Sequence, residues 1–60
     1  MSYIIECGKN EFGKMEYISD MNFKGYYITT DITKAKIFED ESYKKLCFLQ
    51  GWKMVKLDKK

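Results

Sequence analysis

Within residues 41–50 the apolar side chains of Tyr43, Leu46 and Cys47 recur three and four positions apart, the spacing that gives an amphipathic helix one apolar face. Asp40 stands before it as a candidate N-cap, and Gly51 follows as a residue that can adopt the left-handed conformation ending a helix. A ten-residue helix covers only one face of a small sheet. The sequence therefore predicts a two-layer α+β domain.

Four further segments are rich in β-branched and aromatic residues or alternate polar with apolar side chains, as strands do. They are residues 3–7, 14–19, 26–30 and 52–57. We expect a hairpin loop at 8–13, a second turn at 20–22, and a short helical turn over 32–35 with Asp31 as its cap. The predicted order is β-β-β-α-β, a small antiparallel sheet of three to four strands with the helix packed on one face.

The size of the chain permits one domain: it has 60 residues, 45% of them hydrophobic and 17% aromatic, which argues against disorder. We expect a single compact domain over 1–60, with 58–60 as a solvated tail. Strict alternation predicts which side chains meet in its core. They are Tyr3, Ile5, Cys7, Val55 and Leu57 from the outer segments, with Ile28, Phe38, Leu46 and Leu49.

Residue types argue against catalysis. The chain has no histidine, the usual general base, and its two cysteines, Cys7 and Cys47, are 40 positions apart. We expect two buried thiols, no metal site and no cofactor. The stretch 8–15 has the Gly-x-x-x-x-Gly-Lys core of a phosphate loop, but Met15 replaces the Ser or Thr that holds magnesium, and a strand pattern follows. The acidic cluster 39–41 fits a solvated helix start. We therefore expect a protein that is not an enzyme.

The longest uncharged apolar run, residues 46–49, is far shorter than the roughly 20 residues of a membrane-spanning helix. The first residues lack the basic start and apolar stretch of a secretory signal. The expected location is the cytoplasm, without a membrane partner.

Aromatic residues fall on both parities of the predicted strands, more than one core face requires. Strict alternation puts several on the open face, where Tyr, Trp and Met are typical of protein interfaces. The expected protein-binding residues are Tyr17, Tyr27, Trp52 and Met54, with Lys53 and Lys56 as a charged rim. The free edges of the sheet offer a second route, strand addition.

Two other functions fit the same residues. The chain has eleven lysines, nine acidic residues interleaved with them, and no arginine. Nucleic-acid binding would therefore depend on Lys9, Lys14 and Lys24 meeting at one end of the sheet, together with the lysines of the last strand and tail. A structural homodimer would bury the aromatic face against a second copy.

Three stretches of the last 35 residues resemble small phage- and prophage-encoded proteins of low-GC Gram-positive bacteria, which have no assigned activity. The stretches are Gly25-Tyr26-Tyr27-Ile28, Asp31-Ile32-x-x-Ala35-x-x-Phe38 and Gly51-Trp52-Lys53-x-Val55-Lys56. The resemblance implies a small inhibitor or adaptor that binds one host protein, for example a defence or nucleic-acid enzyme. It carries over no functional residues.

Overall fold

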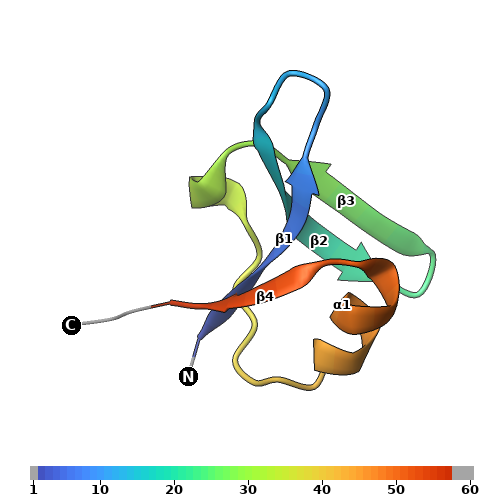
Figure 1. Cartoon of the computed structure of the whole chain (residues 1–60). Helices are drawn as coiled ribbons and strands as arrows, with labels where there is room; N and C mark the ends of the chain where they lie inside the picture. Colours follow the sequence, from blue (N-terminus) through green and yellow to red (C-terminus); the bar gives the residue numbers. More distant parts are fainter. Residues whose placement is uncertain (1, 58–60) are drawn as a thin grey trace.

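The chain folds as a four-stranded antiparallel sheet with one α-helix, seen in a computed structural model that describes residues 2–57 (Figure 1). In chain order the elements are β1 (Tyr3–Lys9), β2 (Met15–Asn22), β3 (Gly25–Thr29), the 3-10 turn η1 (Ile32–Lys34), α1 (Lys44–Gln50) and β4 (Lys53–Lys56). The strands lie in the order β3-β2-β1-β4, each antiparallel to its neighbours. The predicted α+β class and the order β-β-β-α-β are confirmed. The predicted tail, 58–60, lies outside the described residues.

The helix is shorter than predicted and begins at Lys44 instead of residue 41. Asp40 caps a preceding turn, because its Oδ1 accepts a hydrogen bond from the Ser42 N–H over 3.0 Å. The carbonyl oxygen of Glu41 then accepts from the Lys44 N–H. Tyr43 is the helix N-cap and makes no side-chain capping bond. The predicted role of Asp40 as helix N-cap is therefore wrong.

The other two predicted boundary residues are confirmed. Gly51 ends α1 in the left-handed conformation with φ of 76°, and its N–H reaches the carbonyl oxygens of Cys47 and Phe48. Asp31 caps η1, since its Oδ1 accepts from the Thr33 N–H over 3.0 Å. Both contacts are local along the chain, which is why the sequence pattern found them.

Both hairpins form. The first turn lies at residues 10–14, overlapping most of the predicted loop at 8–13, and Asn10 Oδ1 at its start accepts from the N–H groups of Phe12 and Lys14. The second lies at residues 23–24, where Asn22 Oδ1 accepts from the Lys24 N–H over 2.8 Å. The expected turn at 20–22 is wrong because β2 continues through Asn22.

A bulge in β2 changes which of its side chains face the helix. The register with β3 shifts between Ile18 and Asp20, so Ser19 is the extra residue. Ile18 is fully buried and Met21, three positions later, packs against the same core. Strict alternation would separate these two residues, and the bulge places them on one face.

The register between β1 and β4 reverses the expected parity of β4. Met54 lies opposite Ile5, and Val55 lies opposite Ile4. Residues opposite each other in an antiparallel pair share a face. Met54 therefore joins the helix-covered core, whereas Val55 lies on the other face, the reverse of the expectation.

One cluster of side chains fills the space between sheet and helix. It contains Tyr3, Ile5, Ile18, Phe38 and Cys47, with Cys7, Met21, Trp52 and Met54 packed against it. Tyr3 and Phe38 also form an isolated β-bridge with two hydrogen bonds of 2.8 Å. Ile28 and Leu49 were expected in the core, but they are 45% and 71% exposed. The expectation is wrong for both, because β3 is an edge strand and the short helix buries only Cys47.

Candidate protein-binding surface

A hollow lies between the β2–β3 hairpin and α1. It has a volume of about 260 Å³, and we call it the hairpin groove. Its lining residues are Met21, Asn22, Phe23, Lys24, Gly25 and Tyr26 from the hairpin, Leu46 and Gln50 from α1, and Trp52 after the helix.

Two aromatic rings pack together in the wall of the groove. Tyr26 and Trp52 meet edge to face, with ring centroids 4.9 Å apart and planes at 82°, a favoured arrangement for aromatic pairs. Trp52 also packs against the core cluster. The ring pair therefore links the start of β3 to the two-residue segment between α1 and β4.

The outer rim of the groove is the tip of the hairpin. The Phe23 side chain is 94% exposed, and Lys24 Nζ lies 5.9 Å from the centroid of its ring. A cation over a ring at this distance is attracted by the ring quadrupole. Among residues 2–57, no carboxylate lies within ion-pair distance of Lys24, whose ammonium group faces solvent next to an apolar hollow.

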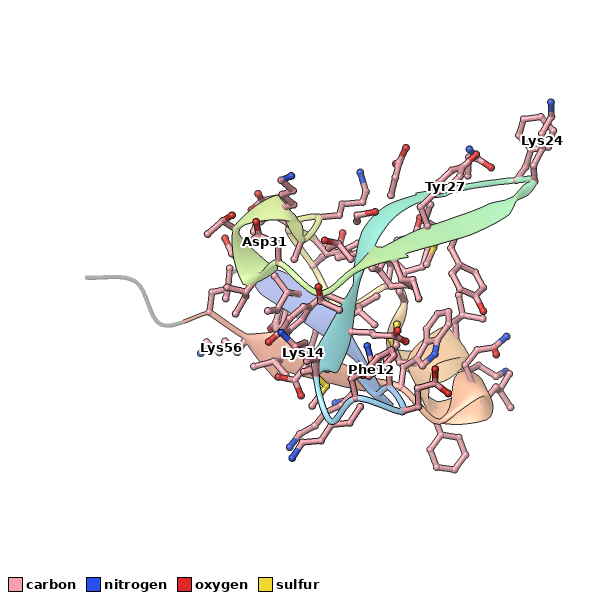
Figure 2. The ribbon with its side chains drawn as sticks, turned by 90° about the horizontal axis from the view of Figure 1, so that it is seen from above. Phe12, Lys14, Lys24, Tyr27, Asp31 and Lys56 are labelled. Carbon is pink, nitrogen blue, oxygen red and sulfur yellow. The ribbon has the colours of Figure 1, made fainter. Side chains whose placement is uncertain are left out.

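The hairpin also has a hollow outside the helix-covered side. This second hollow, about 250 Å³, is lined by Asn22, Lys24, Gly25, Tyr26 and Tyr27. Tyr27 is 62% exposed, and Figure 2 shows it on the side of the hairpin away from α1. Since Tyr26 and Tyr27 alternate across β3, the hairpin presents an aromatic ring on each of its faces.

The two edges of the sheet differ in chemistry. β4, at one edge, carries Lys53 and Lys56 at its ends, and charged side chains protect edge strands from pairing with other chains. β3, at the other edge, has the sequence Gly-Tyr-Tyr-Ile-Thr and no charge. The β3 edge is the unprotected one.

The structure does not bring the expected protein-binding residues onto one surface. By the strand registers, Tyr17, Tyr27 and Lys53 share the face away from α1, whereas Met54 and Lys56 share the face of Ile5 and Tyr3. Trp52 and Met54 pack against the core. Their expected exposure on the open face is wrong, because the register of β4 is shifted by one residue from the one assumed.

The sequence pattern missed the residues that line the groove from the hairpin tip and the helix. A signal for Phe23 was present: in Asn22-Phe23-Lys24-Gly25 an aromatic residue stands among turn-forming ones, where the chain cannot bury it. The sequence pattern predicts Leu46 in the core, but the side chain is only half-buried and lines the groove wall. No sequence pattern points to Gln50.

The turn lysines do not form the basic end that nucleic-acid binding was expected to use. Lys9 and Lys14 flank the β1–β2 turn, whereas Lys24 lies in the β2–β3 turn, at the opposite end of β2. Figure 2 shows Lys14 and Lys24 far apart on the molecule. The expected meeting of these lysines is wrong.

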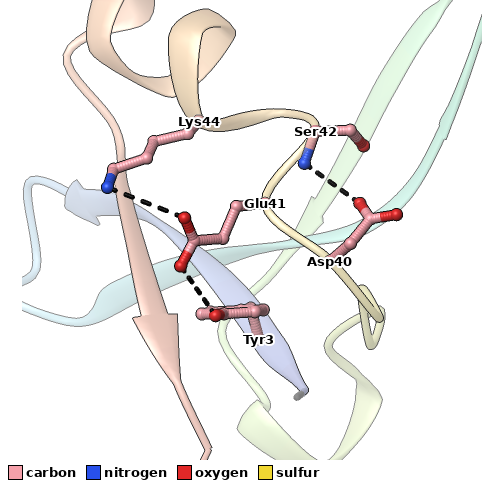
Figure 3. A network of polar contacts seen from close by, with 5 residues as sticks. All are labelled: Tyr3, Asp40, Glu41, Ser42 and Lys44. Carbon is pink, nitrogen blue, oxygen red and sulfur yellow. Dashed lines mark hydrogen bonds and ion pairs between the residues drawn. The ribbon is translucent and has the colours of Figure 1, made fainter.

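Three titratable side chains form a contact network that joins β1 to the start of α1. Tyr3 Oη donates to Glu41 Oε2 over 2.7 Å, and Lys44 Nζ lies 3.7 Å from Oε1 of the same carboxylate (Figure 3). The hydrogen bond from Tyr3 is the main cause of a lowered pKa of Glu41, and Lys44 adds to it. Burial raises the pKa of the Cys7 thiol to about 11 and also raises that of Cys47. Both cysteines are free thiols.

The described residues 2–57 contain no group of three or more His, Cys, Asp or Glu side chains arranged to hold a metal ion. Over the same range, no helix combines the length and apolarity needed to cross a bilayer.

The fold and the groove together define a small α+β domain with a four-stranded antiparallel sheet, one helix and an apolar hollow beside an edge hairpin. A scan against protein-family models gave no match, and searches of curated proteins and of solved structures gave no significant match either.

Proposed function

We propose that this chain is a non-catalytic protein-binding module that contacts its partner through the hairpin groove and the aromatic side chains around it. The observation that carries the proposal is the position of Phe23, almost wholly exposed on the rim of an apolar hollow whose wall includes a packed aromatic pair. Exposed rings grouped around a hollow are typical of binding sites, because each ring gains about 2 kcal/mol when a partner removes it from water.

The contact between Tyr26 and Trp52 supports the same function. Association costs free energy when side chains become ordered, and a preformed site reduces that cost. Tyr26 and Trp52 already pack against each other without a partner, so part of the aromatic wall is preformed. Tyr and Trp side chains are enriched among the hot-spot residues that contribute most of the binding free energy of protein interfaces.

The partner in this proposal is a host protein. The resemblance to phage- and prophage-encoded proteins implies an inhibitor or adaptor acting in a bacterial cytoplasm, and this biological setting belongs to the proposal.

Affinity capture with matched variants tests the proposal. The tagged chain is incubated with a lysate of a low-GC Gram-positive bacterium, next to a Phe23→Ser/Tyr27→Ser variant. Both side chains are exposed, so the fold is expected to persist. The control is Phe12→Ser/Phe48→Ser, which removes two exposed rings outside the groove.

We expect a protein that is retained by the wild-type chain and the control but lost, at least tenfold, from the Phe23/Tyr27 variant. Capture of the same proteins in equal amounts by all three chains would refute the proposed surface, and so would capture of none. Circular dichroism of each variant verifies that the fold is intact.

A further inference from the structure

The volume of the hairpin groove sets the size of what it can hold. Small-molecule sites in proteins usually occupy about 300–1,000 Å³, and the groove, at about 260 Å³, is below that range. A hollow of this size with Leu46 and Trp52 in its walls suits one large apolar side chain of a partner.

The groove is continuous with the free edge of the sheet. Gly25 and Tyr26 line the groove and are also the first two residues of β3, the uncharged edge strand. A peptide that paired with β3 would therefore run beside the groove. Because strand side chains alternate, such a peptide would direct every second side chain toward the groove side.

Charge defines the remaining property of the partner. Lys24 is the only charged residue that lines either hollow, and no carboxylate within residues 2–57 pairs with it. A carboxylate on the partner would find an unpaired ammonium group at the edge of an apolar hollow, where partial removal of water strengthens the attraction.

We infer that the partner binds as an extended acidic segment, which adds a strand to the β3 edge, inserts one large apolar side chain into the hairpin groove and places an Asp or Glu carboxylate against Lys24. This inference rests on the proposed protein-binding function and specifies the chemistry of the partner at the same site.

A second copy of the chain is the competing occupant of this site. Two β3 strands paired antiparallel would place each Lys24 near the end of the other β3, where the first acidic residue is Asp31. Asp31 Oδ1 already accepts hydrogen bonds from the N–H and Oγ1 of Thr33, and Oδ2 has no hydrogen-bond partner among the described residues. Self-association is therefore measured beside peptide binding, and a dimer is one of the outcomes that decide between the two occupants.

Peptide selection tests the inference. A yeast-displayed library of random twelve-residue peptides is enriched on the immobilised wild-type chain. We expect enriched peptides in which polar and apolar residues alternate, with Asp or Glu near a Trp, Phe or Leu. Their affinity should fall at least tenfold for Lys24→Glu and stay within twofold for Lys34→Glu. The control changes an exposed lysine on η1, beyond the other end of β3.

Hydrogen exchange on the complex tests the mode of binding. Strand addition predicts slower amide exchange within Gly25–Thr29 when a selected peptide is bound. No enrichment, peptides without acidic residues, equal affinity for Lys24→Glu, or unchanged exchange in β3 would each overturn the inference. A micromolar dimer that is lost in Tyr27→Ser would also overturn it, in favour of a second copy.

The two proposals fail in different ways. If the peptides show no such preference while the lysate experiment still yields a protein lost from the Phe23/Tyr27 variant, the protein-binding function stands and the strand-addition mode falls. If neither experiment yields a partner, both fall.

Discussion

The phenol group of Tyr3 donates a hydrogen bond to Glu41 Oε2 over 2.7 Å, joining residues 38 positions apart (Figure 3). Tyr3 begins β1, and Glu41 belongs to the turn that leads into α1. Lys44, in the first turn of the helix, approaches the other carboxylate oxygen. The contact fixes the start of the helix to the start of the central strand, and this helps to set the position of α1 over the sheet.

This contact predicts a pH dependence of stability. The pKa of Glu41 is lowered in the folded state, chiefly by the Tyr3 hydrogen bond, so its contribution is complete above the unfolded-state pKa of about 4.3. The contribution is lost as pH falls through the lower folded-state pKa. The same bond raises the pKa of Tyr3, whose contribution is therefore complete below pH about 10 and lost as pH rises through the raised folded-state value.

We expect Tyr3→Phe to lower the melting temperature most between pH 5 and pH 9, with the difference from wild type shrinking toward pH 2 and pH 11. Thermal unfolding followed by circular dichroism over this range measures it. Asp31 and Asp40 also have lowered pKa values, and their acid-induced losses are common to both chains and cancel in the difference. A difference that stays constant with pH would contradict the prediction.

The pair Ile18 and Ile28 tests how unequally the two strands of one hairpin contribute to the core. The residues lie opposite each other in β2 and β3, but Ile18 is fully buried and Ile28 is 45% exposed. We expect Ile18→Val to lower the free energy of unfolding by about 1 kcal/mol, a fall in melting temperature of roughly 4–8 °C for a domain of this size. Ile28→Val, the matched control, should lower the free energy of unfolding by less than half as much. Equal decreases for the two variants in urea unfolding would contradict the prediction that burial determines the difference.

The end of the helix depends on the backbone conformation of Gly51. Its φ of 76° is costly for residues with a Cβ, and a Cβ there would meet no neighbouring atom within 4 Å. Gly51→Ala should therefore lower the free energy of unfolding by about 1–2 kcal/mol through backbone strain alone. Gly51→Asn should recover part of that loss, because Asn tolerates the left-handed region. If Ala and Asn are equally destabilising in chemical denaturation, the assigned cause is wrong.

The cysteines should react slowly. With a pKa of about 11, the Cys7 thiol is ionised at pH 8 only to about one part in 1,000, and the thiolate is the reactive form. We expect alkylation by iodoacetamide at pH 8 to be on the order of 100-fold slower than that of a free cysteine, rising to the normal rate in 6 M guanidinium chloride. Mass spectrometry of timed samples measures the rate. Rapid alkylation of Cys7 in the folded chain would contradict the burial that raises its pKa.

Local patterns were enough to predict much of the secondary structure. The cap of η1 by Asp31 and the left-handed end of α1 at Gly51 involve atoms a few residues apart, so short sequence windows contain their causes. The prediction that the helix begins at residue 41 was wrong because Asp40 can cap either a turn or a helix. The Tyr3 contact with Glu41 holds this segment in a turn.

The candidate site could not be predicted to the same extent. Trp52 and Met54 were assigned to the open face by alternation, and a register of β4 that pairs Met54 with Ile5 places them toward the core instead. The bulge at Ser19 had a similar effect on β2, because it brings Ile18 and Met21 to one side. Neither a register nor a bulge leaves a reliable trace in the order of residues along one strand.

By itself, the order of residues determined that this chain forms a two-layer α+β domain, because one short amphipathic segment among strand-forming segments leaves few other ways to bury its apolar side chains. Only the tertiary structure decided which aromatic rings remain outside. Strand alternation has a period of two, so a shift of one residue in pairing moves every side chain of a strand to the opposite face. That pairing is fixed by contacts between segments distant in sequence, and these contacts created the hollow between the β2–β3 hairpin and α1.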